Sequence, residues 1–135
     1  MSASGAPPPR RGLLDTSVFI AREAGRPLGE LPDAAAVSVV TLAELHLGVL
    51  MAPTAPLRAR RLRTLMAVQE AFEPLPIDAE VGRIFAELVA AARRKGQRPK
   101  IMDTWIAATA VAHGLTVYTQ DEDFAALPQV RVARV

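Results

Sequence analysis

The sequence contains no cysteine and only two histidines, His46 and His113. It therefore cannot form a disulfide, a thiolate nucleophile or a thiolate metal site, and it offers little imidazole to a transition metal. Any metal that this chain binds must be held mainly by oxygen.

Long apolar runs are also missing, although 50% of the residues are hydrophobic. No run approaches the roughly 20 residues that a membrane-spanning helix needs. The first residues, MSASGAPPPRRG, lack the apolar segment of a signal peptide. We therefore expect a cytoplasmic protein that has no membrane partner. The net charge of only +2 excludes a uniformly basic nucleic-acid binder of the histone kind.

The length of 135 residues suits one domain with one shared core. Residues 1–11 include three successive prolines, a composition that resists both helix and sheet, so we expect a flexible N-terminal tail there. The folded domain is expected to span residues 12–135.

Strand and helix patterns alternate along this domain. Short apolar or β-branched stretches predict strands at 13–14, 36–40, 75–77, 115–118 and 130–132, and the segments between them carry helical spacing and helix-ending signals. The longest such segment, 54–72, is expected to bury Leu62, Leu65, Met66 and Phe72 on one side. Strands joined by crossover helices predict an α/β fold with a mainly parallel sheet sandwiched by helices.

Four acidic residues lie where the strands of such a sheet end. Asp15 follows the first strand, Glu44 lies in the first turn of the helix after the second, Asp103 begins an alanine-rich helix, and Asp121 follows a later strand. Ligands of open α/β sheets bind beyond the carboxyl ends of the strands. We therefore predict that these four carboxylates meet at one edge of the sheet.

Clustered carboxylates oppose one another's ionisation unless a cation lies between them. An oxygen-only donor set favours Mg²⁺ or Mn²⁺ over Zn²⁺, and one or two such ions could activate water for attack on a phosphodiester. The cluster therefore predicts metal-dependent phosphodiester hydrolysis.

Each acid also has a purely structural explanation. Asp15 could cap the short helix that follows it. Glu44 completes the Thr-x-x-Glu pattern of a capping box, in which it would bond back to the helix N-terminus. Asp103 could complement a helix dipole, and Asp121 could belong to a solvated acidic turn. The joint placement of the four acids, rather than any one of them, favours a site.

Four stretches around these acids also match a known family. They are LDTSVFI at 14–20, TLAEL at 41–45 with Gly48, MDTWIAATA at 102–110 and TQDEDF at 119–124. With these motifs in this order, the sequence resembles the PIN-domain family, and within it the VapC-like toxins of bacterial toxin–antitoxin pairs. The resemblance covers nearly the whole chain from Leu13 onward.

The resemblance implies a single PIN-like domain and an endoribonuclease that depends on Mg²⁺ or Mn²⁺ and cuts structured RNA such as tRNA or rRNA. It also implies a cognate VapB-like antitoxin and a homodimer. Carried over by motif, Asp15, Asp103 and Asp121 would bind the metal, with Asp123 as the alternative to Asp121, and Glu44 would complete the catalytic cluster. The hydroxyls of Thr16, Ser17 and Thr119 would orient the carboxylates.

Basic residues crowd into the approach to Asp103. Arg93, Arg94, Arg98 and Lys100 could guide an RNA backbone into the site, although a solvated helix end explains them equally well. For the homodimer, the apolar residues Val81, Ile84, Phe85 and Ile106 could serve an interface as well as a core.

Two other functions compete with the ribonuclease. A PIN-type module could bind RNA or a protein partner with little turnover. A phosphate-handling receiver or phosphatase of similar topology is disfavoured, because the paired acids that it would need around Asp15 are missing.

Overall fold

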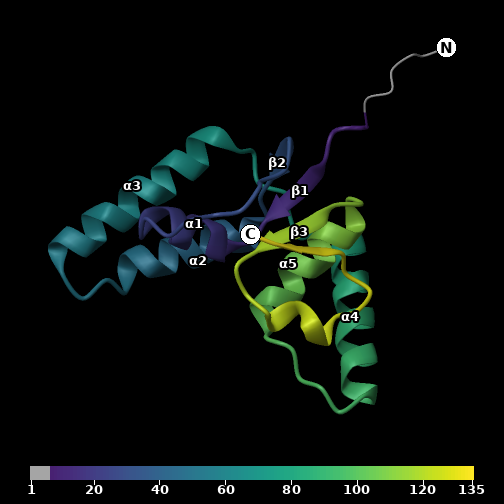
Figure 1. The fold of residues 1–135 in the computed structure, drawn as a ribbon. Helices are drawn as coiled ribbons and strands as arrows, with labels where there is room; N and C mark the ends of the chain where they lie inside the picture. The colour runs from purple at the N-terminus through teal and green to yellow at the C-terminus, as the bar shows by residue number, and fades with distance from the viewer. Residues whose placement is uncertain (1–6) are drawn as a thin grey trace.

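A four-stranded parallel sheet, in the order β2-β1-β3-β4, forms the centre of the molecule (Figure 1). The strands are β1 (Arg11–Leu14), β2 (Ala34–Ala36), β3 (Thr116–Thr119) and β4 (Val132–Arg134). The computed structural model describes residues 7–135, without the side chain of Asp123, so the first six residues of the predicted tail lie outside it. The predicted parallel α/β fold is confirmed.

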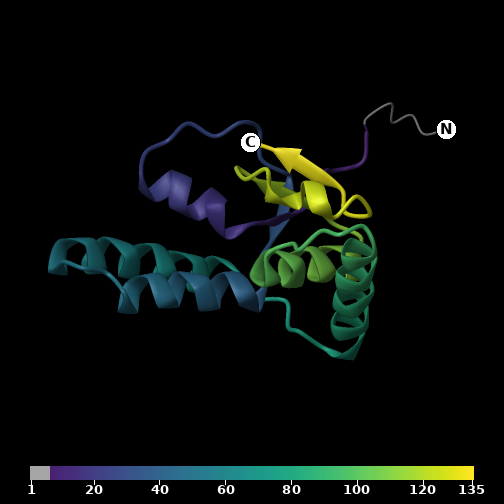
Figure 2. The ribbon, with the colours of Figure 1, turned by 90° about the horizontal axis from the view of Figure 1, so that it is seen from below.

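Five helices cover the two faces of the sheet (Figures 1 and 2). They are α1 (Thr16–Glu23), α2 (Val39–Leu50), α3 (Ala55–Ala71), α4 (Ala79–Arg94) and α5 (Ile101–Ala112), followed by the short 3₁₀ helix η1 (Asp123–Ala126). In the described residues, no helix is both long enough and apolar enough to cross a membrane.

Two cores form because successive side chains of a strand point to opposite faces. On β1, Leu13 packs with residues of α4 and α5, whereas Leu14 packs with residues of α1, α2 and α3. On β3, Val117 and Tyr118 divide in the same way. The sheet is therefore buried on both sides, as parallel sheets generally are.

The N-terminus of α2 differs from the prediction. The expected strand at 36–40 is wrong, because β2 ends at Ala36 and Ser38 caps a helix that already begins at Val39, its Oγ accepting from the Val40 N–H at 3.0 Å. The predicted capping box is wrong for the same reason. Glu44 lies beyond the first turn of α2, too far along the helix to bond back to its N-cap.

The predicted strand at 75–77 is reduced to a single bridge between Leu75 and Ser38. Pro74 and Pro76 flank Leu75 and have no N–H to donate to a neighbouring strand, which explains why pairing stops there. The bridge still connects the segment before α4 to the start of α2.

The helix α3 buries less than its sequence predicted. Leu65 is buried, but Leu62 and Met66 are 42% and 52% exposed, so the prediction of a buried side is wrong for these two. The reason is that α3 packs mainly against α2, with which it forms a hairpin that extends away from the sheet (Figure 2).

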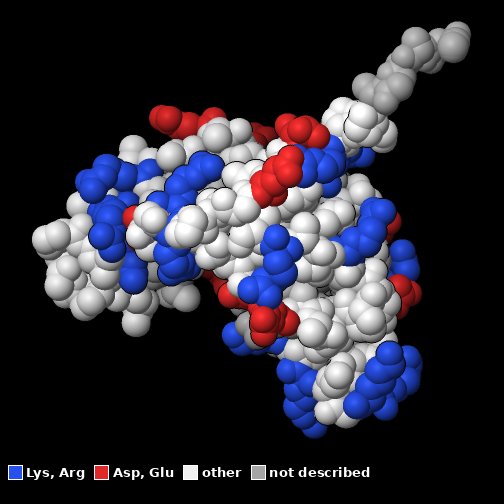
Figure 3. All heavy atoms as spheres, in the orientation of Figure 1, with Lys and Arg blue, Asp and Glu red and all other residues white. Residues whose placement is uncertain are grey.

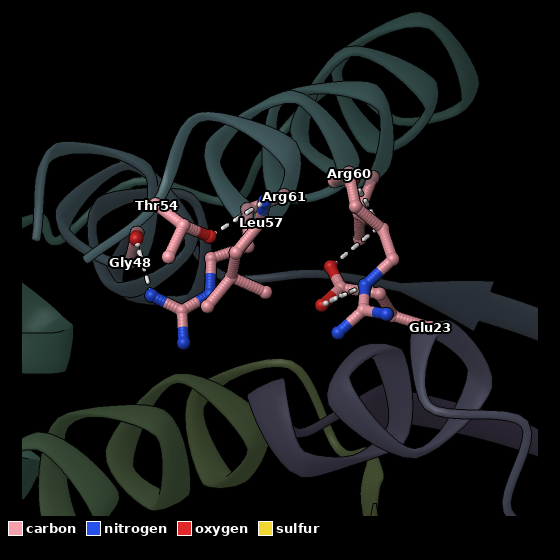
Figure 4. Close-up of polar contacts among 7 residues, drawn as sticks. Glu23, Gly48, Thr54, Leu57, Arg60 and Arg61 are labelled. Carbon is pink, nitrogen blue, oxygen red and sulfur yellow. Dashed lines mark hydrogen bonds and ion pairs between the residues drawn. The ribbon is translucent and has the colours of Figure 1, made fainter. Parts of the chain in front are cut away.

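Polar contacts attach α3 to its neighbours (Figure 4). Arg61 Nη1 donates to the Gly48 carbonyl of α2 at 2.7 Å, and Arg60 Nε lies 3.6 Å from a carboxylate oxygen of Glu23 on α1. Glu23 also accepts a hydrogen bond from Thr64. Several arginines of α3 thus have structural partners.

Three of the four predicted interface residues belong to the core instead. Val81 and Ile106 are fully buried, Ile84 is 7% exposed, and all three pack in the cluster beneath α4 and α5. Phe85 is partly buried and stacks on Trp105 with ring centroids 3.7 Å apart. A dimer surface at Val81, Ile84 and Ile106 is therefore ruled out by their burial.

Candidate active site

A cleft of about 420 Å³ lies beyond the carboxyl ends of β1 and β3, and all four predicted acids line it. Asp15 comes from the end of β1, Glu44 from α2, Asp103 from α5, and Asp121 from the loop after β3. The other lining residues are Thr16, Ser17, Ile20, Arg26, Lys100, Ile101 and Met102. The structure thus brings the four acids together, where the sheet topology placed them.

Asp15 is only 2% exposed and occupies the N-cap position of α1, but its side chain makes no capping hydrogen bond. Its Oδ2 instead accepts hydrogen bonds from Ser17 Oγ at 2.7 Å and from Thr119 Oγ1 at 2.8 Å. Burying a carboxylate is costly unless it is hydrogen-bonded, and these two hydroxyls offset part of that cost. The capping explanation of Asp15 does not hold.

The same two hydroxyls anchor the loop that carries Asp121. Ser17 Oγ accepts from the backbone N–H of Gln120 at 2.9 Å, and Thr119 Oγ1 accepts from the N–H of Asp121 at 2.9 Å. The chain after β3 is therefore connected through side-chain hydroxyls to Asp15. This arrangement sets the position of the Asp121 backbone relative to Asp15.

Glu44 is half-buried, and Oε1 accepts a hydrogen bond of 2.6 Å from Thr16 Oγ1. Burial raises the pKa of Glu44 above its usual value, and repulsion by Asp15 and Asp121 raises it further, against the opposing effect of the Thr16 hydrogen bond. Glu44 therefore senses the charges of two other acids of the cleft.

Asp103 lies in the first turn of α5 and is 8% exposed. The helix N-terminus adds a partial positive charge that favours an anion at this position. Asp121 is partly exposed and lines the cleft. The side chain of Asp123, the alternative fourth acid, lies outside the described residues, so the preference for Asp121 stays a prediction.

One of the four predicted cations, Lys100, lines the cleft. The other three do not: Arg93 and Arg94 lie in the last turn of α4, and Arg98 lies in the loop beyond it. Figure 3 shows basic side chains gathered over the end of α4. Arg26, which the sequence did not suggest, also lines the cleft. No local motif marks it, because it follows Gly25 in what reads as an ordinary helix end.

The donor chemistry of the cleft suits a hard divalent cation. Its acidic lining offers carboxylate oxygens, and both histidines are exposed and lie outside it. Among the described residues, no three acidic or histidine side chains form a ready-made ligand group for one ion. Mg²⁺ does not need such a group, since it typically binds one or two carboxylates and keeps several waters. The residues present therefore fit Mg²⁺ or Mn²⁺ better than Zn²⁺.

Known proteins that are similar to this chain point to one family. The family model described as PIN domain matches residues 12–130. Among curated proteins, Ribonuclease VapC5 of Mycobacterium tuberculosis is 52% identical over 121 residues, covering 88% of this chain and 89% of that protein. Ribonuclease VapC4 of the same organism is 51% identical over 131 residues, covering 93% and 98%.

Solved structures with the same fold belong to the same group of proteins. The VapBC-5 toxin–antitoxin structure from Mycobacterium tuberculosis contains a chain with a TM-score of 0.79 and 47% identity, covering 94% of this chain and 98% of that one. A chain of the FitAcB structure from Neisseria gonorrhoeae has a TM-score of 0.72 and 31% identity, covering 89% and 94%.

Proposed function

Because the chain belongs to the PIN-domain family, we propose that it is a metal-dependent endoribonuclease and the toxin component of a toxin–antitoxin pair. The observation that carries the proposal is the convergence of four carboxylates, from four separate segments of the chain, on one cleft. The names of the two ribonucleases that share half of their residues with this chain support the same activity.

We assign Asp15, Asp103 and Asp121 as the residues that would hold Mg²⁺ or Mn²⁺, and we count Glu44 with them as catalytic. A bound ion would supply a more acidic water and neutralise charge on the attacked phosphodiester, whose P–O bond is broken by hydrolysis. Ser17 and Thr119 hold Asp15 in orientation. Glu44, with its raised pKa, is suited to take up a proton at the cleft.

The substrate in this proposal is structured RNA, such as tRNA or rRNA, and the location is the cytoplasm. The partner is a VapB-like antitoxin, in keeping with the VapBC structure that this chain resembles at 47% identity. A homodimer is part of the same proposal.

The test is RNA cleavage in Mg²⁺ by purified Asp15→Asn and Asp103→Asn variants. Each substitution keeps the size of the side chain but removes its charge, so we expect each to abolish cleavage while the protein stays folded. Asp78→Asn is the matched control. Asp78 caps α4 away from the cleft, and asparagine caps helices equally well, so this variant should keep both activity and stability.

Unchanged cleavage by both site variants would refute the assigned site. Tight RNA binding by the wild type in Mg²⁺ without cleavage of any cellular RNA would favour a PIN-type binding module instead.

A further inference from the structure

Arg26 lies at the cleft in a turn whose backbone is fixed. The Gly25 N–H donates to the Arg22 carbonyl at 3.1 Å and the Arg26 N–H donates to the Ala21 carbonyl at 2.8 Å, the pattern of a Schellman motif. Gly25 has the positive φ, 71°, that this motif requires and that glycine adopts at little cost. The end of α1 therefore places Arg26 at a defined point beside the acids.

Gln120 contacts the Arg26 side chain from the loop after β3. Arg26 Nε donates to Gln120 Oε1 at 3.4 Å, while Gln120 Nε2 donates to the carbonyls of Val135 at 2.8 Å and Pro27 at 3.3 Å. Because the two carbonyls can only accept, the amide must turn its oxygen toward Arg26. Gln120 thereby holds Arg26 through a neutral contact.

The charge of Arg26 is not used within the described structure. The cleft carries four carboxylates, yet Arg26 forms no ion pair with any of the described side chains, and the one hydrogen bond that its own side chain makes among them is with Gln120. The side chain is exposed to solvent. A guanidinium presents a planar fork of donors that matches a phosphate group, and it remains charged at any working pH.

We propose that Arg26 is a substrate-binding residue that holds a phosphate of RNA next to the acidic cluster, and that Gln120 is the positioning residue that directs it there. The inference rests on the proposed function and identifies how that site grips its substrate. In this arrangement Arg26 would bind a phosphate next to the scissile phosphate, while the acids act on the scissile phosphate itself.

Binding can be measured separately from cleavage in an Asp103→Asn parent with a short, fluorescein-labelled single-stranded RNA of random sequence. Adding Arg26→Gln should raise Kd by about tenfold, as expected for the loss of a charge-assisted contact. The slope of log K against log salt, which is negative, should also become shallower by about 0.7, the contribution of one phosphate contact on a single strand.

Arg22→Gln is the matched control. Arg22 is an exposed arginine in the last turn of α1 that does not line the cleft, so its replacement should change neither Kd nor the salt slope. With the acids intact, Arg26→Gln should raise KM for RNA cleavage and change kcat little, since it removes binding rather than chemistry.

The role of Gln120 is tested by a double-mutant cycle. Gln120→Ala should raise Kd by less than Arg26→Gln does, and it should add nothing further when Arg26 is already glutamine. A purely structural role of Gln120 would instead weaken binding equally in both backgrounds. That additive result would reject Gln120 as a positioning residue.

Equal salt slopes for the parent and its Arg26→Gln variant would overturn the assignment of Arg26. Continued cleavage by Asp15→Asn and Asp103→Asn, together with a reduced slope for Arg26→Gln, would reject the catalytic site and leave the phosphate contact standing. No RNA binding by the Asp103→Asn parent at low salt would overturn Arg26 as an RNA contact.

Discussion

Replacing Thr119 with valine should destabilise the protein strongly, although valine has nearly the same shape. Thr119 is fully buried, and its hydroxyl donates to Asp15 Oδ2 at 2.8 Å and accepts from the Asp121 N–H at 2.9 Å. A hydrogen bond to a charged group contributes about 1.5 kcal/mol or more, and removing the acceptor of a buried N–H costs about 1 kcal/mol or more. Because the Asp121 N–H is only partly buried, we take the lower values and expect a loss of about 2.5 kcal/mol.

Thr109→Val is the matched control for this prediction. Thr109 is equally buried, but its hydroxyl donates only to the Trp105 carbonyl one turn back in α5, so valine should cost about 1 kcal/mol or less. Urea unfolding of the metal-free proteins measures both losses, provided that the dependence of the unfolding free energy on urea concentration is the same in the variants and the wild type. Equal losses for the two variants would show that the Thr119 hydroxyl has no special role, and the reasoning about Asp15 would be refuted.

Glu44→Gln should stabilise the metal-free protein increasingly as pH rises above 4.5, because folding raises the pKa of Glu44 and the wild type loses stability as this group ionises. A difference in urea midpoint between the variant and the wild type that does not grow with pH would contradict this. Mg²⁺ at about 100 times its Kd should stabilise the wild type by about 2.7 kcal/mol, and Asp103→Asn should lose most of that gain; a wild-type melting temperature indifferent to Mg²⁺ would argue against the metal. Gly12→Ala should cost about 1–3 kcal/mol, because its Cβ would overlap the Tyr118 ring, whereas Gly82→Ala in α4 meets nothing within 4 Å and should be neutral or stabilising; equal midpoints would disprove the clash.

The fold was predictable because its strands are short apolar runs separated by helices. Leu13 and Leu14 are consecutive, and both are buried since each faces a different helical layer. A run that is apolar at successive positions is the pattern of a strand buried on both sides, which requires a parallel sheet between helices. Asp15, Asp103 and Asp121 were predictable for the same reason, since each lies near the end of a strand or the start of a helix, whereas Glu44 lies beyond the first turn of α2.

The start of α2 could not be predicted from local sequence. Val37, Val39 and Val40 favour a strand, and both Ser38 and Thr41 are suitable caps. The choice is made by a distant segment: Leu75 accepts from the Val39 N–H and donates to the Val37 carbonyl, each at 2.9 Å. That bridge extends the chain up to Ser38, and the helix begins directly after it.

The partners of the acids were only partly predictable. Thr16, Ser17 and Thr119 were expected to orient carboxylates, but the hydrogen bond from Thr119 to Asp15 joins residues 104 positions apart. Arg26 was missed because its side-chain partner at the cleft, Gln120, is almost as distant in sequence. Such contacts leave no periodic or local signal.

The choice of hydroxyls as partners explains how the cleft keeps its charge. Asp15 is held by Ser17 and Thr119, and Glu44 by Thr16. A lysine or arginine in their place would orient the carboxylates too, but it would neutralise the charge that attracts a divalent cation, whereas a hydroxyl leaves it intact. Burial raises the pKa of Glu44, and the charges kept on Asp15 and Asp121 raise it further, against the hydrogen bond from Thr16. The neutral amide of Gln120 acts on Arg26 in the same way, because it holds the guanidinium without pairing it to a neighbouring acid and so leaves it available to a phosphate.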